Sequence, residues 1–227
     1  MSEQSELQKR AAALTEATER ALASLESYTC TIVMRDRIKG KLMPESQLYT
    51  QYRKPGAVYL RWVGEQHRGM QASYVPGRDD EGYFMARESG LKGLIGARTW
   101  PQSSPLINTL YPHHFSISES SVVALTQTTL ELQRRAHSLG KLRLESLCTL
   151  HDEELDAPVT KVVAQLSDDP GDGLRWPRCT LFICERHHLP LHVRLDDFDG
   201  GLFGEYVYRD FRPNVVVDES WFALPKR

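Results

Sequence analysis

The residues best suited to chemistry gather in one short stretch toward the C-terminal end of the sequence. Three histidines there precede three aspartates, and imidazole and carboxylate groups can bind a metal ion or exchange protons. They are His187, His188, His192, Asp196, Asp197 and Asp199. Along one extended strand, His188 and His192 would lie ~13 Å apart, whereas metal–nitrogen bonds are ~2 Å long. A turn at Leu189 and Pro190 would bring the two rings closer, so a hydrolase or metal-dependent enzyme remains an alternative that geometry disfavours.

No catalytic residue, metal ligand or cofactor is predicted from the other motifs. The sequence has no HExxH, GxSxG or Cys–His signature, and its four cysteines form no CxxC pair. Cys179 and Cys184 are expected to point to opposite faces of a strand ~16 Å apart, beyond the ~7 Å limit for a disulfide. Buried free thiols are therefore expected, although the disulfide state of all four, including Cys30 and Cys148, stays open at this stage.

The elements that would position these residues are mainly strands. Tyr28, Cys30, Ile32 and Met34 alternate with polar residues, a period of two that is typical of a half-buried antiparallel strand over residues 28–39. Nine further segments show strand patterns between turn signals. They are residues 47–53, 57–63, 69–75, 82–87, 142–151, 159–166, 179–186, 191–198 and 203–211.

Two helices are predicted. Residues 2–27 repeat apolar side chains such as Leu7, Leu14 and Leu22 at three- and four-residue spacing, so this helix should lay its apolar stripe on the sheet. A second helix should begin at Ser118 as its N-cap and run to about residue 139, with Gly140 as its stop.

Residues 88–117 break the rhythm of the strands. They contain three glycines and three prolines without a sustained period, yet they are too apolar for a disordered segment. The spacing of Gly90, Gly93 and Gly96 is not that of a phosphate-binding loop. We interpret this stretch as a gate over an apolar space.

The predicted architecture is a single α+β domain over residues 1–227. About ten antiparallel strands form a curved sheet, an incomplete β-barrel, with the helix of residues 1–27 and the lid loop and helix of residues 88–140 on its concave face. Side chains on that face and in the lid are expected to contact an apolar ligand. They are Ile32, Leu60, Trp62, Tyr74, Phe84, Leu91, Leu94, Ile95, Trp100, Val193 and Tyr206.

Composition excludes several classes of partner. A net charge of −2 and a pI near 6.5 provide no basic field for nucleic acid. No apolar run approaches the ~20 residues of a membrane span. The N-terminus lacks a signal-peptide pattern, which predicts a cytoplasmic protein if that terminus is native and an exported one if a signal has been removed.

Four segments resemble a known family. They are YTCTIVMRDRIKGKL, VYLRWVG, GLKGLIG and LPLHVRLDDFDGGLFGEYVYRDFRPNVVVDESWF. Together they are similar to the exported bacterial domain-of-unknown-function family 1571, which is similar in layout to LolA/LolB-type outer-membrane lipoprotein carriers. The resemblance implies a half-barrel with a helical lid, a place in the periplasm or cell envelope, and no catalytic residue.

The expected function is a monomeric binding or carrier protein for a lipid, an acyl chain or another apolar ligand. The alternative is a fully packed core, in which case the chain would be an envelope protein–protein interaction module. Such a module could use exposed sheet edges and a modest basic patch. That patch would consist of Arg35, Arg37, Arg53 and Arg61.

Overall fold

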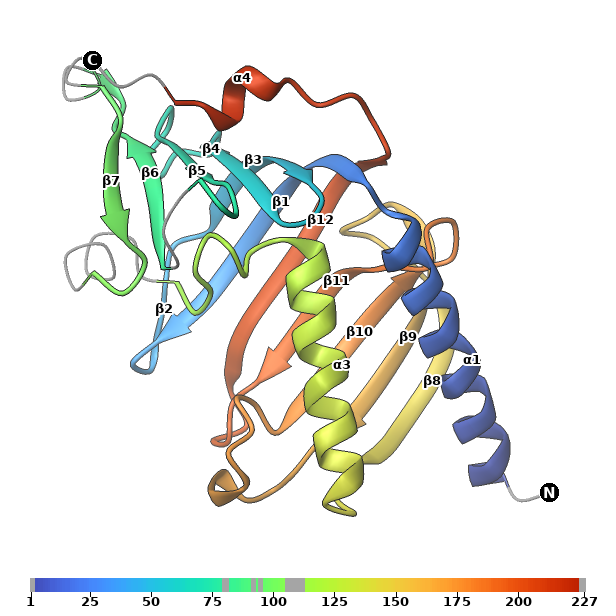
Figure 1. Cartoon of the computed structure of the whole chain (residues 1–227). Helices are drawn as coiled ribbons and strands as arrows, with labels where there is room; N and C mark the ends of the chain where they lie inside the picture. The colour runs from blue at the N-terminus through green and yellow to red at the C-terminus, as the bar shows by residue number, and fades with distance from the viewer. Residues whose placement is uncertain (1–2, 79–81, 91–92, 94–95, 105–112, 225–227) are drawn as a thin grey trace. The chain divides into compact units, whose positions relative to one another are not determined.

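The computed structural model describes residues 3–78, 82–90, 93, 96–104 and 113–224. They form one antiparallel sheet of 12 strands (Figure 1). Along the sheet the order is β7 (Arg98–Pro101), β6 (Tyr83–Arg87), β5 (Gln71–Tyr74), β4 (Ala57–Trp62), β3 (Ser46–Arg53), β1 (Ser27–Ile38), β12 (Leu202–Pro213), β11 (Pro190–Asp196), β10 (Arg178–Cys184), β9 (Ala157–Gln165) and β8 (Arg143–Asp152). The short β2 (Lys41–Leu42) pairs with β1. The two end strands, β7 and β8, do not pair with each other in the described part of the chain, so the sheet is open. The predicted α+β class is confirmed.

The chain divides into two compact units, which are described separately. Unit 1 comprises Met1–Ser24 and Val122–Val207, and unit 2 comprises Leu25–Ser121 and Tyr208–Arg227. Strand β12 therefore contributes its first half to unit 1 and its second half to unit 2.

Unit 1 packs two helices on one face of a sheet. Helices α1 (Glu3–Ser24) and α3 (Val122–Ser138) lie over the same side of strands β8 to β11 (Figure 1). Residues directly opposite each other in an antiparallel pair share a face. The register pairs Leu181 with Val162 on one side and with Val193 on the other, so these three aliphatic side chains form a row across the unit.

Helix α1 confirms the predicted N-terminal helix, but its apolar stripe is not buried as expected. Leu7, Leu14 and Leu22 are only half-buried, and Thr18 is the buried position in the middle of the helix. The stripe borders a cavity instead of packing fully on the strands. Among the described residues, no helix combines the length and the apolar character needed to cross a bilayer.

Helix α3 begins later than predicted. It starts at Val122, four residues after the expected N-cap Ser118, whose hydroxyl instead donates a hydrogen bond to Gln102 Oε1 at 3.0 Å. A turn replaces the predicted first helical turn, because the Glu119 carboxylate accepts bonds from the backbone N–H and the hydroxyl of Ser116. At the other end Gly140 terminates the helix as predicted, with a left-handed φ of 69°.

Unit 2 contains strands β1 to β7, the second half of β12 and the short helix α4 (Glu219–Phe222). All ten predicted strands are present in the two units, with ends shifted by a few residues. Two short strands, β2 and β7, were not predicted. Strand β7 lies inside the stretch predicted to be irregular, because Trp100 and its neighbours pair with β6 opposite Phe84.

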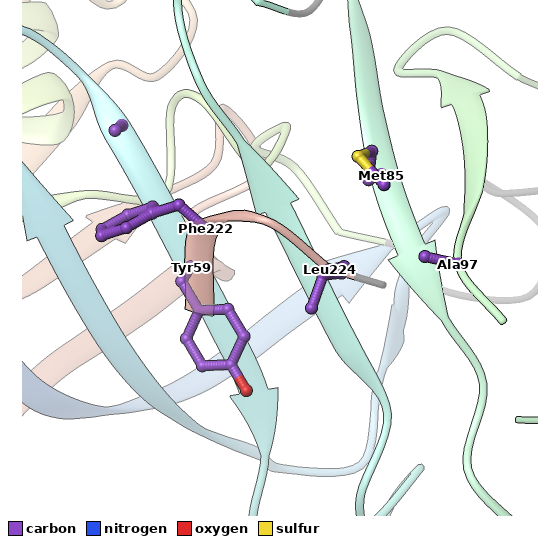
Figure 2. Close-up of a cluster of buried hydrophobic side chains, with 6 residues drawn as sticks. Tyr59, Met85, Ala97, Phe222 and Leu224 are labelled. Carbon is purple, nitrogen blue, oxygen red and sulfur yellow. The ribbon is translucent and has the colours of Figure 1, made fainter. Parts of the chain in front are cut away.

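The C-terminal residues cover one face of the unit 2 sheet. We call residues 217–224, which include α4, the C-terminal cover. Its Phe222 and Leu224 join a buried cluster with Tyr59 and Met85 from the strands (Figure 2). Asp218 caps α4, accepting a bond from the backbone N–H of Ser220 at 2.9 Å, and the predicted closing helical turn is thus confirmed.

All four cysteines are free thiols, and three of them are buried as expected. Cys148 is the exception, since it is exposed on β8. Burial raises the pKa of Cys30 well above its ordinary value and raises that of Cys179 to about 11. These two thiols therefore stay protonated and unreactive at neutral pH.

We expect a thiol reagent at pH 8 to modify Cys148 within minutes in the native protein and the other three cysteines only after unfolding. Counting thiols with and without denaturant checks this expectation. A Cys148→Ser variant is the control and should show no fast phase. Fast modification of Cys179 in native protein would mean that the space between α3 and β10 opens readily.

Candidate functional site

A cavity of about 430 Å³ lies within unit 1, between the two helices and the strands. Its volume falls in the ~300–1,000 Å³ range of small-molecule sites. Its wall on the sheet side is aliphatic. That wall consists of Leu142, Leu144, Val162, Ala164, Leu181, Ile183 and Pro190.

Helix α1 forms an open wall of this cavity. Ala11, Thr15 and Thr18 line it at three- and four-residue spacing, and such small side chains cannot fill the space between the helix and the strands. Gln8 and Ala12 also line the cavity and are exposed. The cavity therefore reaches the surface alongside α1.

Helix α3 forms the opposite wall with its own hydroxyl groups already satisfied. Thr126 donates to the carbonyl oxygen of Val122 at 2.6 Å, and Thr129 donates to that of Leu125 at 2.8 Å. Both side chains thus line the cavity without an unmet hydrogen bond. The buried hydroxyl of Thr18 differs, since it has no hydrogen-bond partner among the described atoms. Leaving a buried hydroxyl without a hydrogen bond costs free energy, and a polar group of a ligand could reduce that cost by bonding to it.

Two of the predicted ligand contacts belong to unit 1. Val193 and Tyr206 are opposite each other on β11 and β12, and both share the helix-facing side with Leu181. Neither is among the residues that line the cavity. None of the cavity-lining residues was predicted as a ligand contact, although Leu14 belongs to the predicted apolar stripe and the small Ala11 and Thr15 beside it were a usable signal.

Unit 2 contains a smaller cavity of about 90 Å³. Three predicted contacts line it, namely Leu60, Trp62 and Phe84. The other residues of its wall are mixed, and several of them are large and apolar. They include Met34, Leu48, Met70, Phe115 and Ile117.

The remaining predicted contacts of unit 2 share a face with this cavity or lie outside the described residues. Ile32 pairs with Leu48, which lines the cavity, and Trp100 pairs with Phe84, so both share its face without lining it. Tyr74 lies on that face too, two residues from Ala72 of the wall. The lid positions outside the described residues are Leu91, Leu94 and Ile95.

Residues 113–117 cover the small cavity and are attached to the sheet through two histidines. His113 Nδ1 lies 2.8 Å from the buried carboxylate of Asp36, and His114 Nε2 lies 3.1 Å from the carbonyl oxygen of Arg37. Further along, Tyr208 donates to the carbonyl oxygen of Ser120 at 3.3 Å. These bonds hold Phe115 and Ile117 over the strands.

The stretch predicted to offer acid–base or metal chemistry forms a buried ionic cluster. His192 Nδ1 lies 2.9 Å from Asp152 Oδ2, and its Nε2 lies 3.2 Å from Glu205 Oε1. The imidazole stacks on Phe182 with ring centroids 4.2 Å apart. Burial alone would lower the pKa of His192, but hydrogen bonds to Glu205 and Asp152 outweigh it, so the pKa is raised. His192 is therefore a buried side chain that is held by two carboxylates.

The other members of that stretch do not join His192. His188 is exposed, and Asp196 is buried between Arg178, at 2.8 Å, and Arg194, at 3.1 Å. No group of three or more His, Cys, Asp or Glu side chains within the described ranges is arranged to hold a metal ion.

The suggested basic patch is not present as four free cations. Arg35 pairs with Glu45 at 2.9 Å, and Arg53 pairs with Glu219 at 3.2 Å. Arg61 lies against the rings of Tyr49 and Trp221. These side chains instead help to hold local structure.

Comparisons with known proteins support the fold and identify the family. No curated protein matches the sequence. The structure is similar to an uncharacterized conserved protein from Thermus thermophilus, with 12% identity, coverage of 96% of this chain and 95% of the other, and a TM-score of 0.52. It is also similar to lipoprotein LppX of Mycobacterium tuberculosis, with 14% identity, coverage of 91% and 97%, and a TM-score of 0.51.

At such low identity these likenesses show a shared fold and nothing further. The sequence evidence is more specific, because the family model for DUF1571, described as a protein of unknown function, matches residues 25–226. That match spans all of unit 2 except its last residue, together with every strand of unit 1. The chain therefore belongs to the DUF1571 family.

Proposed function

We propose that this chain is a cell-envelope binding or carrier protein for a lipid, an acyl chain or another apolar ligand. The observation that carries the proposal is the 430 Å³ cavity of unit 1, with an aliphatic wall of strands and an open wall along α1. The predicted placement in the envelope is supported by the family resemblance. In this proposal the chain needs no cofactor and catalyses no reaction.

The size of the cavity is sufficient for useful affinity. A group about the size of a water molecule occupies roughly 30 Å³. Since a methylene group is of similar size, the cavity has space for about a dozen of them. Each buried methylene contributes ~0.8 kcal/mol, so an acyl chain could gain roughly 8–10 kcal/mol before the cost of association. Binding of this kind needs few polar contacts, which agrees with the scarcity of motifs in the sequence.

Two measurements test the proposal. Native mass spectrometry of freshly purified protein should detect a co-purified lipid, and delipidated protein should bind a fluorescent fatty acid saturably with one site per chain. An unlabelled fatty acid should displace the probe, whereas an equally charged short-chain acid should not. If no lipid travels with the protein and no saturable uptake occurs, the proposal is wrong.

A further inference from the structure

One face of the unit 2 sheet combines arginines, aromatic rings and an amide. The register of β3 and β4 pairs Tyr49 with Arg61 and Gln51 with Tyr59, and Arg53 follows on the same face of β3. The small cavity of unit 2 lies on the other face, because its lining residues alternate with these along the strands. We call the surface formed by these five residues the arginine–aromatic face.

The C-terminal cover fits this face through its aromatic side chains. Trp221 meets the rings of Tyr49 and Tyr59 edge-on, with centroids 5.5 and 5.0 Å apart. The guanidinium of Arg61 lies 5.4 Å from the Tyr49 ring and 5.3 Å from the Trp221 ring, so it lies against both rings. Phe222 follows in the buried cluster of Figure 2.

Charge and backbone bonds complete the fit. Arg53 lies 5.4 Å from the Phe222 ring and 3.2 Å from the Glu219 carboxylate. The carbonyl oxygen of Phe222 accepts a bond from the Ser73 hydroxyl at 2.7 Å and another from Arg78. Recognition therefore uses an acidic side chain, two aromatic rings and one backbone carbonyl.

The cover is joined to β12 by a short, exposed tether. Asn214 fixes the end of the strand, because its side-chain oxygen accepts the Glu26 N–H at 2.8 Å. Two residues later Val216 is fully exposed and makes no packing contribution. The cover can therefore leave the sheet without disturbing the strand that precedes it.

The fit beneath the cover is incomplete. Gln51 Oε1, Arg53 Nε and Arg61 Nε are buried and have no hydrogen-bond partner among the described atoms. Such atoms are normally paired or hydrated, and water would reach them if the cover left. Hydration of these three groups therefore favours the uncovered state and offsets part of what the aromatic contacts contribute.

We propose that the arginine–aromatic face is a binding surface for a peptide segment of another protein, in which an acidic residue is followed by two neighbouring aromatic residues. The chain's own cover occupies this surface as a displaceable substitute. The arginines select the acidic residue by charge, and the uncovered rings receive the aromatic pair. This inference concerns a different unit from the ligand cavity and does not depend on it.

The test uses the full chain and a fluorescein-labelled peptide with the sequence VVVDESWFAL, which is that of residues 215–224. Wild-type protein should bind the peptide weakly, because a tethered competitor acts at roughly millimolar effective concentration. A Phe222→Ala chain, whose cover is loosened, should bind at least tenfold more tightly in fluorescence anisotropy. Val216→Ala in the exposed tether is the matched control and should behave as wild type.

Charge reversal makes the test specific. In the Phe222→Ala background, Arg53→Glu should abolish binding, and a peptide carrying Glu219→Arg should restore it. Circular dichroism and thermal unfolding report whether each variant is folded. Hydrogen exchange of wild-type protein supplies a second readout, since excess peptide should speed exchange of the Trp221 and Phe222 amides.

Three results would overturn the proposal. The first is a folded Phe222→Ala chain that does not bind the peptide more tightly than wild type. The second is peptide binding that Arg53→Glu leaves unchanged, which would place the peptide elsewhere. The third is a stable dimer of the Phe222→Ala chain in which one copy's cover fills the other's face, which would assign the surface to a second copy of this chain.

Discussion

An Ala11→Trp variant is expected to bind the fatty-acid probe about a thousandfold more weakly than wild type. Ala11 is half-buried on the cavity side of α1, so an indole at this position enters the cavity without displacing packed side chains. It removes space for roughly five methylene groups, each contributing ~0.8 kcal/mol. The loss of ~4 kcal/mol corresponds to nearly three powers of ten in the dissociation constant.

The matched control is the same substitution two residues further along the helix. Ala13 is exposed and does not line the cavity, so Ala13→Trp should retain wild-type affinity. Thermal unfolding of both variants would show whether stability is preserved. If Ala11→Trp bound the probe as tightly as Ala13→Trp, the cavity of unit 1 would not be the ligand site.

The second large effect is expected from removing His192. A His192→Ala variant leaves Asp152 and Glu205 buried without the imidazole between them, and breaking a buried ionic arrangement of this kind costs ~3–5 kcal/mol. Chemical denaturation should measure that loss at pH 6. The control is His151→Ala: His151 pairs with Asp156 at 3.1 Å on the surface, so its removal should cost less than ~1 kcal/mol.

The effect of His192 should depend on pH in a defined direction. Its ordinary pKa is 6.5, and its pKa in the folded protein is raised. Its contribution to the free energy of unfolding is therefore complete below about pH 6.5 and is lost as the pH rises through the raised value. The stability gap between wild type and His192→Ala should narrow over that range. A gap that widened with rising pH would show that the imidazole is neutral in the folded state.

The strand plan could be predicted from the sequence because each strand carries its own local signal. Alternation over Tyr28, Cys30, Ile32 and Met34 marks β1, and the turn residues between later strands separate them. Gly140 likewise marks the end of α3 through its own backbone freedom. Strand β7 could not be predicted, because its four residues include a proline and an arginine and show no alternation of apolar and polar side chains. Only their pairing with β6 makes them a strand.

The candidate site depended on contacts that no local pattern reveals. His192 meets Asp152 from 40 positions earlier and Glu205 from 13 positions later, so its burial could not be foreseen from neighbouring aspartates. The cavity depends on which apolar positions of α1 are small. The sequence predicts the stripe, whereas the space above the strands arises from the short side chains of Ala11 and Thr15, which border the cavity.

During synthesis, helix α1 is made long before the strands that it covers. Helix α1 ends at Ser24, while the rest of unit 1 begins only at Val122, about 100 residues later. At a synthesis rate of roughly 5–20 residues per second, the helix waits some 5–20 s before α3, the next part of unit 1, begins, and longer before the strands that it covers exist. A strongly apolar helix would be bound by chaperones during that delay. The small alanine and threonine side chains that accompany the leucines of its stripe leave the cavity open, and they also let the newly made helix remain in water until its partners are synthesised.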